Sequence, residues 1–192
     1  ASDVYKRQQH LVSEGCKRIA LLCGPENVTI GGNRMEGYEK AMEANHLPAK
    51  TKLIWHCSDF TVEAGKETTR QLLSRQERPD AIFGITDDLA IGAIEAIKEK
   101  GLNIPEDIAV VGFSNTKRSR YMNPTVSSIN QFPEKIGRAA AELLFDQILN
   151  SKHAQIKKEI INCELIIRES SDRLCKTCLL YTSDAADDLI GV

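Results

Sequence analysis

Short apolar runs alternate along the chain with longer segments in which apolar and polar residues are mixed. Runs such as Arg18–Cys23 and Asp80–Ile85 have the length and apolar character of strands that are buried on both faces. In the longer segments apolar residues recur at three- and four-residue steps, which is typical of one face of a helix. The pattern predicts strands at residues 18–23, 52–57, 80–85, 108–112, 126–130 and 159–167, and helices at 32–45, 61–74, 87–100 and 132–150.

This alternation predicts an α/β fold with a parallel, doubly wound sheet. A helix between two parallel strands makes a right-handed crossover and covers one face of the sheet. In such sheets, ligands bind beyond the carboxyl ends of the strands. The segments to inspect for function therefore follow the predicted strands, at residues 24–34, 58–61, 86–87 and 114–115.

The two ends of the chain are related at the DNA level. Asp3–Gln8 can be encoded by GAT GTG TAT AAG AGA CAG, and the reverse complement, read one base later, is TGT CTC TTA TAC ACA TCT, which encodes Cys178–Ser183. This inverted sequence resembles a transposon-end adapter of sequencing libraries, and such scars are excluded from fold reasoning. We therefore expect residues 1–8 to be adapter-derived and the tail at 173–192 to be doubtful at its start and artefactual from 178. The natural protein is expected to span 9–172, as a piece of something longer.

Composition and charge exclude some classes of protein. Apolar residues make up 42% and charged residues 27% of the chain, as in ordinary globular proteins. No run approaches the roughly 20 apolar residues of a membrane span, so no membrane partner is expected. The 25 Lys and Arg residues do not exceed the 27 Asp and Glu residues, which argues against a nucleic-acid-binding surface in this segment.

The cysteines do not indicate a metal or redox site. Cys175 and Cys178 have CxxC spacing, but Cys178 belongs to the adapter-derived tail, and the other cysteines are scattered, mostly in or beside apolar runs. Buried free thiols behave as small hydrophobes. This usage favours a reducing compartment, and no metal or cofactor is expected.

Catalytic chemistry finds little support in the sequence. The nucleophile-elbow, phosphate-loop, dinucleotide-binding and zinc-protease motifs do not occur, and the four histidines are dispersed. Asp87 and Asp88 are adjacent at a predicted helix start, where they cannot both face one substrate. Asp87 suits a role at the helix N-terminus as well as a ligand contact. No catalytic residue is assigned.

Binding chemistry is better represented at the predicted ligand edge. Arg34 lies in the first turns of a helix that begins there, and a guanidinium can donate paired hydrogen bonds to vicinal hydroxyls or to a carboxylate. A solvent-exposed helix arginine is the alternative. Phe60 lies in a loop at a strand end, where its ring can cover a sugar, stack on a purine or cap the core.

A series of motifs, in order and at matching spacing, resembles the lactose/galactose-repressor (LacI/GalR) family. The motifs are Gly15–Gly24, Asn33–Tyr38, Arg78–Gly84, Thr86–Ala93, Gly101–Phe113 and Leu165–Ser170. The resemblance implies a bacterial transcription factor with an N-terminal helix-turn-helix and a two-lobed effector domain similar to periplasmic sugar-binding proteins. In that family an effector between the lobes shifts a conformational equilibrium that sets operator affinity.

By the same resemblance, residues 9–172 are mostly the second of the two lobes, plus a crossover helix of the first lobe at 132–150. The implied effector contacts are Arg34, Phe60, Thr86, Asp87 and Ser114. Ser114 departs from the family, because many members have an aspartate there, and Thr86 stands where many have an asparagine. The residues implied at or near the subunit interface of a homodimer are Ile91, Ile94, Tyr121 and Gln131.

The predicted function is effector sensing and dimerisation in a cytoplasmic transcriptional regulator, not catalysis. The expected partners are a small-molecule effector, a sugar or sugar-like metabolite, and operator DNA that binds through a missing N-terminal domain. The alternative is a periplasmic sugar-binding protein of a transporter, which shares the fold. Because the first lobe's sheet is missing, we expect the helix at 132–150 to project with its mostly apolar stripe exposed, at Ile136, Ala140, Leu143, Leu144 and Gln147.

Overall fold

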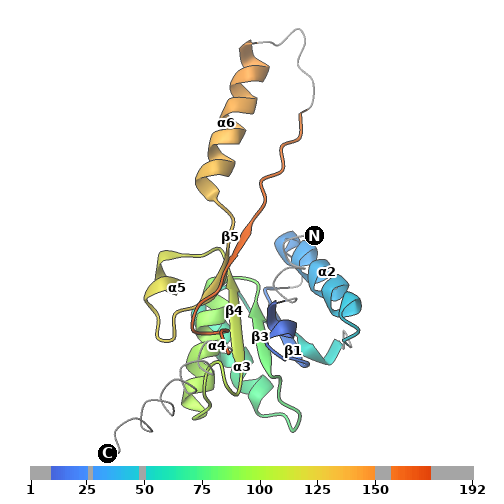
Figure 1. Ribbon diagram of the computed structural model, residues 1–192, viewed down its shortest axis with the longest axis vertical. Helices are drawn as coiled ribbons and strands as arrows, with labels where there is room; N and C mark the ends of the chain where they lie inside the picture. Colours follow the sequence, from blue (N-terminus) through green and yellow to red (C-terminus); the bar gives the residue numbers. More distant parts are fainter. Residues whose placement is uncertain (1–9, 26–27, 48–50, 150–156, 174–192) are drawn as a thin grey trace, which may run out of the picture.

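In the computed structural model of the protein, residues 10–25, 28–47, 51–149 and 157–173 are described. Six strands form one sheet in the order β2-β1-β3-β4-β5-β6 (Figure 1). Their bounds are β1 Ile19–Cys23, β2 Ile54–His56, β3 Ala81–Gly84, β4 Ala109–Phe113, β5 Ser127–Asn130 and β6 Glu164–Ile166. The helices are α2 Thr29–Ala44, α3 Val62–Leu73, α4 Asp87–Glu99, α5 Lys117–Tyr121 and α6 Pro133–Leu149, and a 3-10 turn at Thr51–Leu53 precedes β2.

The sheet is parallel except at one edge. The strands from β2 to β5 run in the same direction, with Leu21 of β1 opposite Phe83 of β3. In contrast, β6 runs antiparallel to β5, with Leu165 opposite Ile129. The predicted α/β class is confirmed, and the sheet is mostly parallel, with an antiparallel edge strand that was not predicted. The strand order changes direction between β1 and β3, which is where sheets of this kind bind ligands.

The central strands explain the short apolar runs of the sequence. Every residue of β1, β3 and β4 is buried, because helices cover both faces of a parallel sheet. Their bounds lie within one residue of the predicted ones. The fully buried strands form the middle of the hydrophobic core, and they fix the edge at which their connecting loops meet.

Glycines let α3 and α4 pack at short distance. A Cβ atom built on Gly92 of α4 would lie 2.1 Å from the carbonyl oxygen of Val62. One built on Gly65 of α3 would lie 2.6 Å from the carbonyl oxygen of Leu89. Real Cβ atoms do not approach backbone this closely, so a side chain at either position would push the helices apart.

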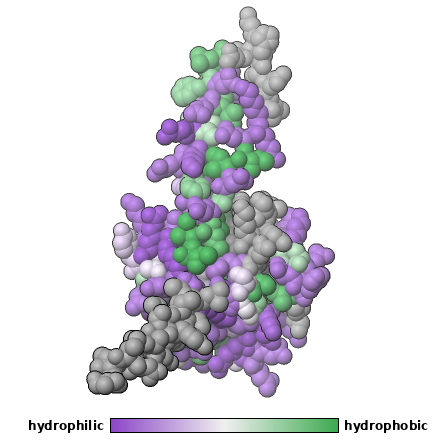
Figure 2. All heavy atoms as spheres, in the orientation of Figure 1, coloured by the Kyte–Doolittle hydropathy of each residue, from purple (hydrophilic) through white to green (hydrophobic). Residues whose placement is uncertain are grey.

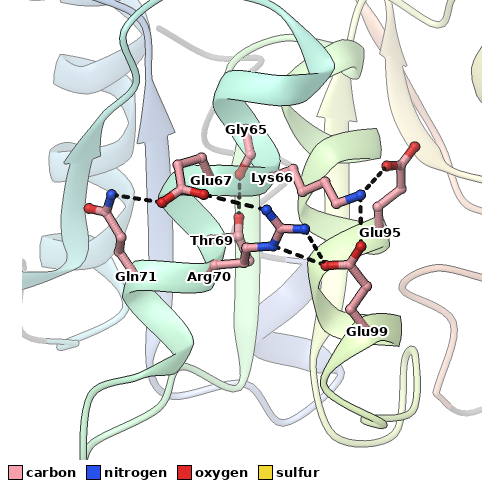
Figure 3. Close-up of polar contacts among 8 residues, drawn as sticks. All are labelled: Gly65, Lys66, Glu67, Thr69, Arg70, Gln71, Glu95 and Glu99. Carbon is pink, nitrogen blue, oxygen red and sulfur yellow. Dashed lines mark hydrogen bonds and ion pairs between the residues drawn. The ribbon is translucent and has the colours of Figure 1, made fainter.

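Ion pairs join the exposed parts of the same two helices. Lys66 of α3 lies 3.2 Å from Glu95 and 2.8 Å from Glu99 of α4, and Arg70 lies 2.8 Å from Glu99 (Figure 3). The hydrogen bonds from Lys66 and Arg70 lower the pKa of Glu99. The helices α3 and α4 therefore form one continuous layer.

Side chains of β4 show that α4 and α2 cover opposite faces of the sheet. A Cβ atom on Gly112 would lie 3.2 Å from that of Ala90, so this face carries α4. Phe113 points to the other face, because successive side chains of a strand alternate. There, Arg34 of α2 lies over the Phe113 ring. The hydroxyl of Tyr38 also anchors α2, by donating to the carbonyl oxygen of Ile19 at 2.8 Å.

The arm, which we define as α6 and residues 157–163, projects away from the sheet (Figures 1 and 2). Ala139 is the one buried residue of α6 in the described structure, whereas Leu144, Phe145 and Ile148 are 57%, 62% and 61% exposed. The predicted stripe is exposed at Ile136, Ala140, Leu144 and Gln147 and half-buried at Leu143. The expectation of a projecting helix with an uncovered apolar face is confirmed.

Several elements differ from the sequence prediction. The strand predicted at 52–57 is shorter, at Ile54–His56, because a 3-10 turn occupies Thr51–Leu53, and α2 begins at Thr29 instead of residue 32. The pattern does not predict α5, whose five residues have no apolar period and which begins where the Thr116 hydroxyl accepts from the Ser119 N–H. The last strand is shorter than the predicted 159–167, because residues 157–163 run along α6 instead of pairing in the sheet (Figure 1). The predictions for residues 1–8 and for the tail at 178–192 lie outside the described residues.

Candidate functional site

Arg34 lies where β3 and β4 end. Its Nη1 donates a hydrogen bond to the carbonyl oxygen of Ile85 at 2.5 Å. Its guanidinium carbon lies 3.8 Å from the centre of the Phe113 ring. Since Ile85 directly follows β3 and Phe113 ends β4, both contacts hold the guanidinium at the carboxyl edge of the sheet.

The charge of Arg34 is partly withdrawn from water. The side chain is half-buried, and burial lowers the pKa of Arg34. The guanidinium stays protonated, because the ordinary pKa of arginine lies far above neutrality. In the part of the chain that is described, no carboxylate forms an ion pair with it. Such a cation attracts the carboxylate or hydroxyl oxygens of a ligand.

Phe60 covers the end of β1. A Cβ atom on Gly24 would lie 2.1 Å from Cε1 of the Phe60 ring, so the ring rests directly on the glycine. The side chain packs against the hydrophobic core and is half-buried. Phe60 therefore caps the core, while part of its side chain stays exposed at the end of β1. Its contact with an effector stays a prediction.

Thr86 and Ser114 directly follow the two residues that Arg34 contacts. The Thr86 hydroxyl caps α4 by accepting from the Leu89 N–H at 3.3 Å. Ser114 has a φ of 111°, in the left-handed region that residues with a side chain rarely adopt. Both side chains are half-buried. Arg34, Thr86 and Ser114 thus lie at neighbouring strand ends, while their contact with an effector stays a prediction.

Asp87 does not line this edge. Its side chain is almost fully buried, with 1% exposed. One carboxylate oxygen accepts from the Ser128 hydroxyl at 2.5 Å, and the other accepts from the Thr116 N–H at 2.6 Å. Because both oxygens serve protein donors, Asp87 fastens the loop after β4. Its assignment as an effector contact is corrected accordingly.

The predicted interface residues separate into two groups. Ile91 and Ile94 are 0% and 1% exposed, packed beneath the sheet, so neither can touch a second subunit and that prediction is wrong. The physical reason is that they lie on the face of α4 that packs inside the domain. Tyr121 is 87% exposed, and Gln131 is half-buried just before α6. An interface role for these two stays a prediction.

The described residues offer no metal site. In residues 10–25, 28–47, 51–149 and 157–173, no three His, Cys, Asp or Glu side chains are grouped to hold a metal ion. Burial raises the pKa of the Cys16 and Cys23 thiols to about 12, which keeps them from acting as thiolate ligands. Among the described helices, none has the length and apolar character needed to cross a membrane.

The sequence model of the family described as "Periplasmic binding protein-like domain" matches residues 8–171. The chain belongs to this family. Among its relatives, the transcriptional repressor PurR of Haemophilus influenzae is 36% identical over 168 residues, which cover 86% of this chain and 50% of PurR. The chain thus spans about half the length of the curated relatives it matches.

Solved structures of similar proteins narrow the assignment of this chain within the family. The complex of the transcriptional regulator CelR with cellobiose has a TM-score of 0.81 at 31% identity, covering 88% of this chain and 51% of CelR. The lac repressor dimer bound to operator and the anti-inducer ONPF has a TM-score of 0.80 at 27% identity, covering 88% of this chain and 58% of the repressor. The resemblance to LacI/GalR effector-binding domains is confirmed, and these relatives favour a regulator over a transporter protein.

Three residues of this periplasmic binding protein-like domain were given no role from the sequence, although they lie in a segment marked for inspection or in the quoted motifs. They are Phe113, which supports the Arg34 guanidinium, and Asn115 and Arg168, which bond to each other at 2.6 Å. A signal for Phe113 existed, since it is the last apolar residue before a predicted ligand loop. Arg168 lies far from that loop in the sequence, so nothing in the local pattern connects it to Asn115.

Proposed function

We propose that this domain is the effector-sensing part of a bacterial transcriptional regulator. A small effector binds at the carboxyl edge of the sheet, and its occupancy changes the operator affinity of the whole protein. The observation that carries the proposal is the Arg34 guanidinium, which Ile85 and Phe113 hold half-buried at this edge. A partly desolvated cation is stabilised when a ligand oxygen joins it.

Phe60, Thr86 and Ser114 are proposed to complete the contacts. The Phe60 ring suits the C–H face of a sugar or the face of a nucleobase. The hydroxyls of Thr86 and Ser114 can exchange hydrogen bonds with ligand hydroxyls. A serine accepts less strongly than a carboxylate, so the proposed site relies more on Arg34 than on an acidic residue. The cellobiose bound to CelR supports a sugar or sugar-like effector.

The proposed function also includes operator binding, pairing with a second copy of the chain, and a cellular compartment. Operator DNA binds through a segment other than this domain, and the domain pairs with a second copy near Tyr121 and Gln131, as the dimeric lac repressor on its operator suggests. The protein acts in the cytoplasm and catalyses no reaction. A periplasmic transporter protein is the alternative that these relatives disfavour.

The test measures ligand affinity in the complete regulator, recovered with the gene that surrounds this segment. Titration calorimetry with glucose, cellobiose, adenosine and adenine identifies a binding probe. Arg34→Ala is expected to weaken that probe roughly tenfold or more, the usual range for a lost hydrogen bond to a charged group. Operator affinity without the probe should stay unchanged.

Arg75→Ala is the matched control, because Arg75 also places a guanidinium over an aromatic ring, that of Trp55, at 4.4 Å. It lies on the exposed surface, outside the proposed contacts. Unchanged probe affinity in Arg34→Ala, or an equal loss in both variants, would contradict the proposed site.

A further inference from the structure

The loop that carries Ser114 is held in an unusual backbone conformation. Ser114 and Asn115 have φ values of 111° and 48°, so two consecutive residues with side chains occupy the left-handed region. Such conformations are costly and persist where the surroundings determine them strongly.

Each backbone N–H of residues 114–116 has its own acceptor. Ser114 donates to the carbonyl oxygen of Ile129 at 3.0 Å, and Asn115 donates to the hydroxyl of Ser128 at 2.9 Å. Thr116 donates to Asp87 at 2.6 Å. The acceptors come from β5 and from the first turn of α4, so the loop is fastened to both.

Arg168 closes this set of contacts from the segment after β6. Its Nη2 donates to the Asn115 side-chain oxygen at 2.6 Å, and its Nη1 donates to the carbonyl oxygen of Val126 at 2.5 Å. Its backbone N–H donates to the Ser127 hydroxyl at 2.8 Å. The Arg168 guanidinium is half-buried and loses part of its hydration, and this burial, followed by the charge of Arg120, lowers the pKa of Arg168. Hydrogen bonds to a charged donor offset that loss.

We propose that Arg168, acting through Asn115, is a positioning residue for the effector site and links it to the strands that lead to the arm. β5 enters the arm and β6 returns from it, and Arg168 directly ties the β6 side to the loop that presents Ser114. A change at Ser114 therefore reaches the strands on which the arm is carried. The effector part of this inference rests on the proposed function, whereas the positioning part does not.

The first test measures amide hydrogen exchange in the complete regulator. Arg168→Lys keeps the charge but cannot hold Asn115 and Val126 with a planar fork. Exchange of a peptide that contains residues 114–116 should become roughly tenfold faster or more, while peptides from β1 and β3 stay unchanged. Arg70→Lys is the control, since Arg70 bonds Glu99 on the exposed surface of α3 and α4 (Figure 3). Unchanged exchange at 114–116, or equal acceleration across the sheet, would overturn the positioning role.

The second test uses Asn115→Gly, because glycine accepts a φ of 48° and its substitution removes only the partner of Arg168. Melting temperature should not fall, whereas the change in operator affinity caused by the probe that binds in titration calorimetry should shrink several-fold, as in Arg168→Lys. The double variant should be no worse than either single one, since both remove the same bond. Additive losses would refute the link. If none of glucose, cellobiose, adenosine and adenine binds the unaltered protein, the proposed function fails, and the exchange measurement still decides the positioning role.

Discussion

The exposed apolar face of α6 gives the most direct prediction about this chain. The perturbation is Leu144→Lys combined with Ile148→Lys. Full burial of a leucine or isoleucine is worth about 1.5–3 kcal/mol. Because these residues are 57% and 61% exposed, covering what remains is worth about 1–2 kcal/mol each. With Phe145, which is 62% exposed, the face offers about 3–5 kcal/mol to anything that covers it.

The isolated chain is therefore expected to bind a hydrophobic dye and to self-associate. The double variant should bind less dye and sediment as a smaller species, with the same free energy of unfolding, because the replaced side chains are mostly solvent-exposed. Dye fluorescence, sedimentation velocity and urea unfolding check the three quantities. Ala140→Lys with Gln147→Lys is the control, since it adds the same charge to exposed positions of α6 with little loss of apolar area. A dye-silent, monomeric and cooperatively unfolding parent chain would refute the reasoning.

Two further predictions concern stability. Gly92→Ala should lower the free energy of unfolding by about 2–3 kcal/mol, because its Cβ would lie 2.1 Å from the Val62 carbonyl oxygen. Gly137→Ala lies in open space on α6 and should raise the free energy of unfolding by about 0.5–1 kcal/mol. Denaturant unfolding compares them, and similar effects at the two sites would contradict the tight α3–α4 contact. Burial lowers the pKa of His10 below its ordinary 6.5, with Glu14 and Asp172 opposing the shift, so its share of stability is present above pH 6.5 and is lost as the pH falls below it. His10→Gln should flatten the decline in melting temperature between about pH 7 and 5, and parallel profiles for the two proteins would count against this.

The central strands could be predicted from sequence because burial on both faces makes them apolar throughout. β1, β3 and β4 stand out in this way, and turn or helix-capping residues bound them. The direction of β6 could not be predicted, because an apolar run looks the same in a parallel and in an antiparallel pair. The pattern did not predict α5 for a different reason, since five residues are too few to show a helical period.

The candidate site was predictable only as far as the topology determines it. Arg34 follows from its place in the first turns of a helix at the ligand edge. The orientation of Asp87 depends on Thr116 and Ser128, whose positions only the folded chain reveals. The predicted interface role of Ile91 and Ile94 is wrong because it rested on their position along α4. The sequence does not show which face of that helix turns inward.

The paired strands β5 and β6 have a mechanical consequence. Within the described residues, one strand leads into the arm and its antiparallel neighbour returns from it, with Asn130 opposite Glu164 where the arm begins. β5 is also paired with β4 from Ser127 to Ile129, so both strands that carry the arm belong to the wide sheet. Their cross-strand hydrogen bonds resist sliding, since a one-residue slip would turn every side chain to the other face. The arm is therefore held at its base by two strands at once, and its distance from the sheet stays fixed. A load on the arm passes to the sheet through both strands and is not taken up by a hinge in one of them.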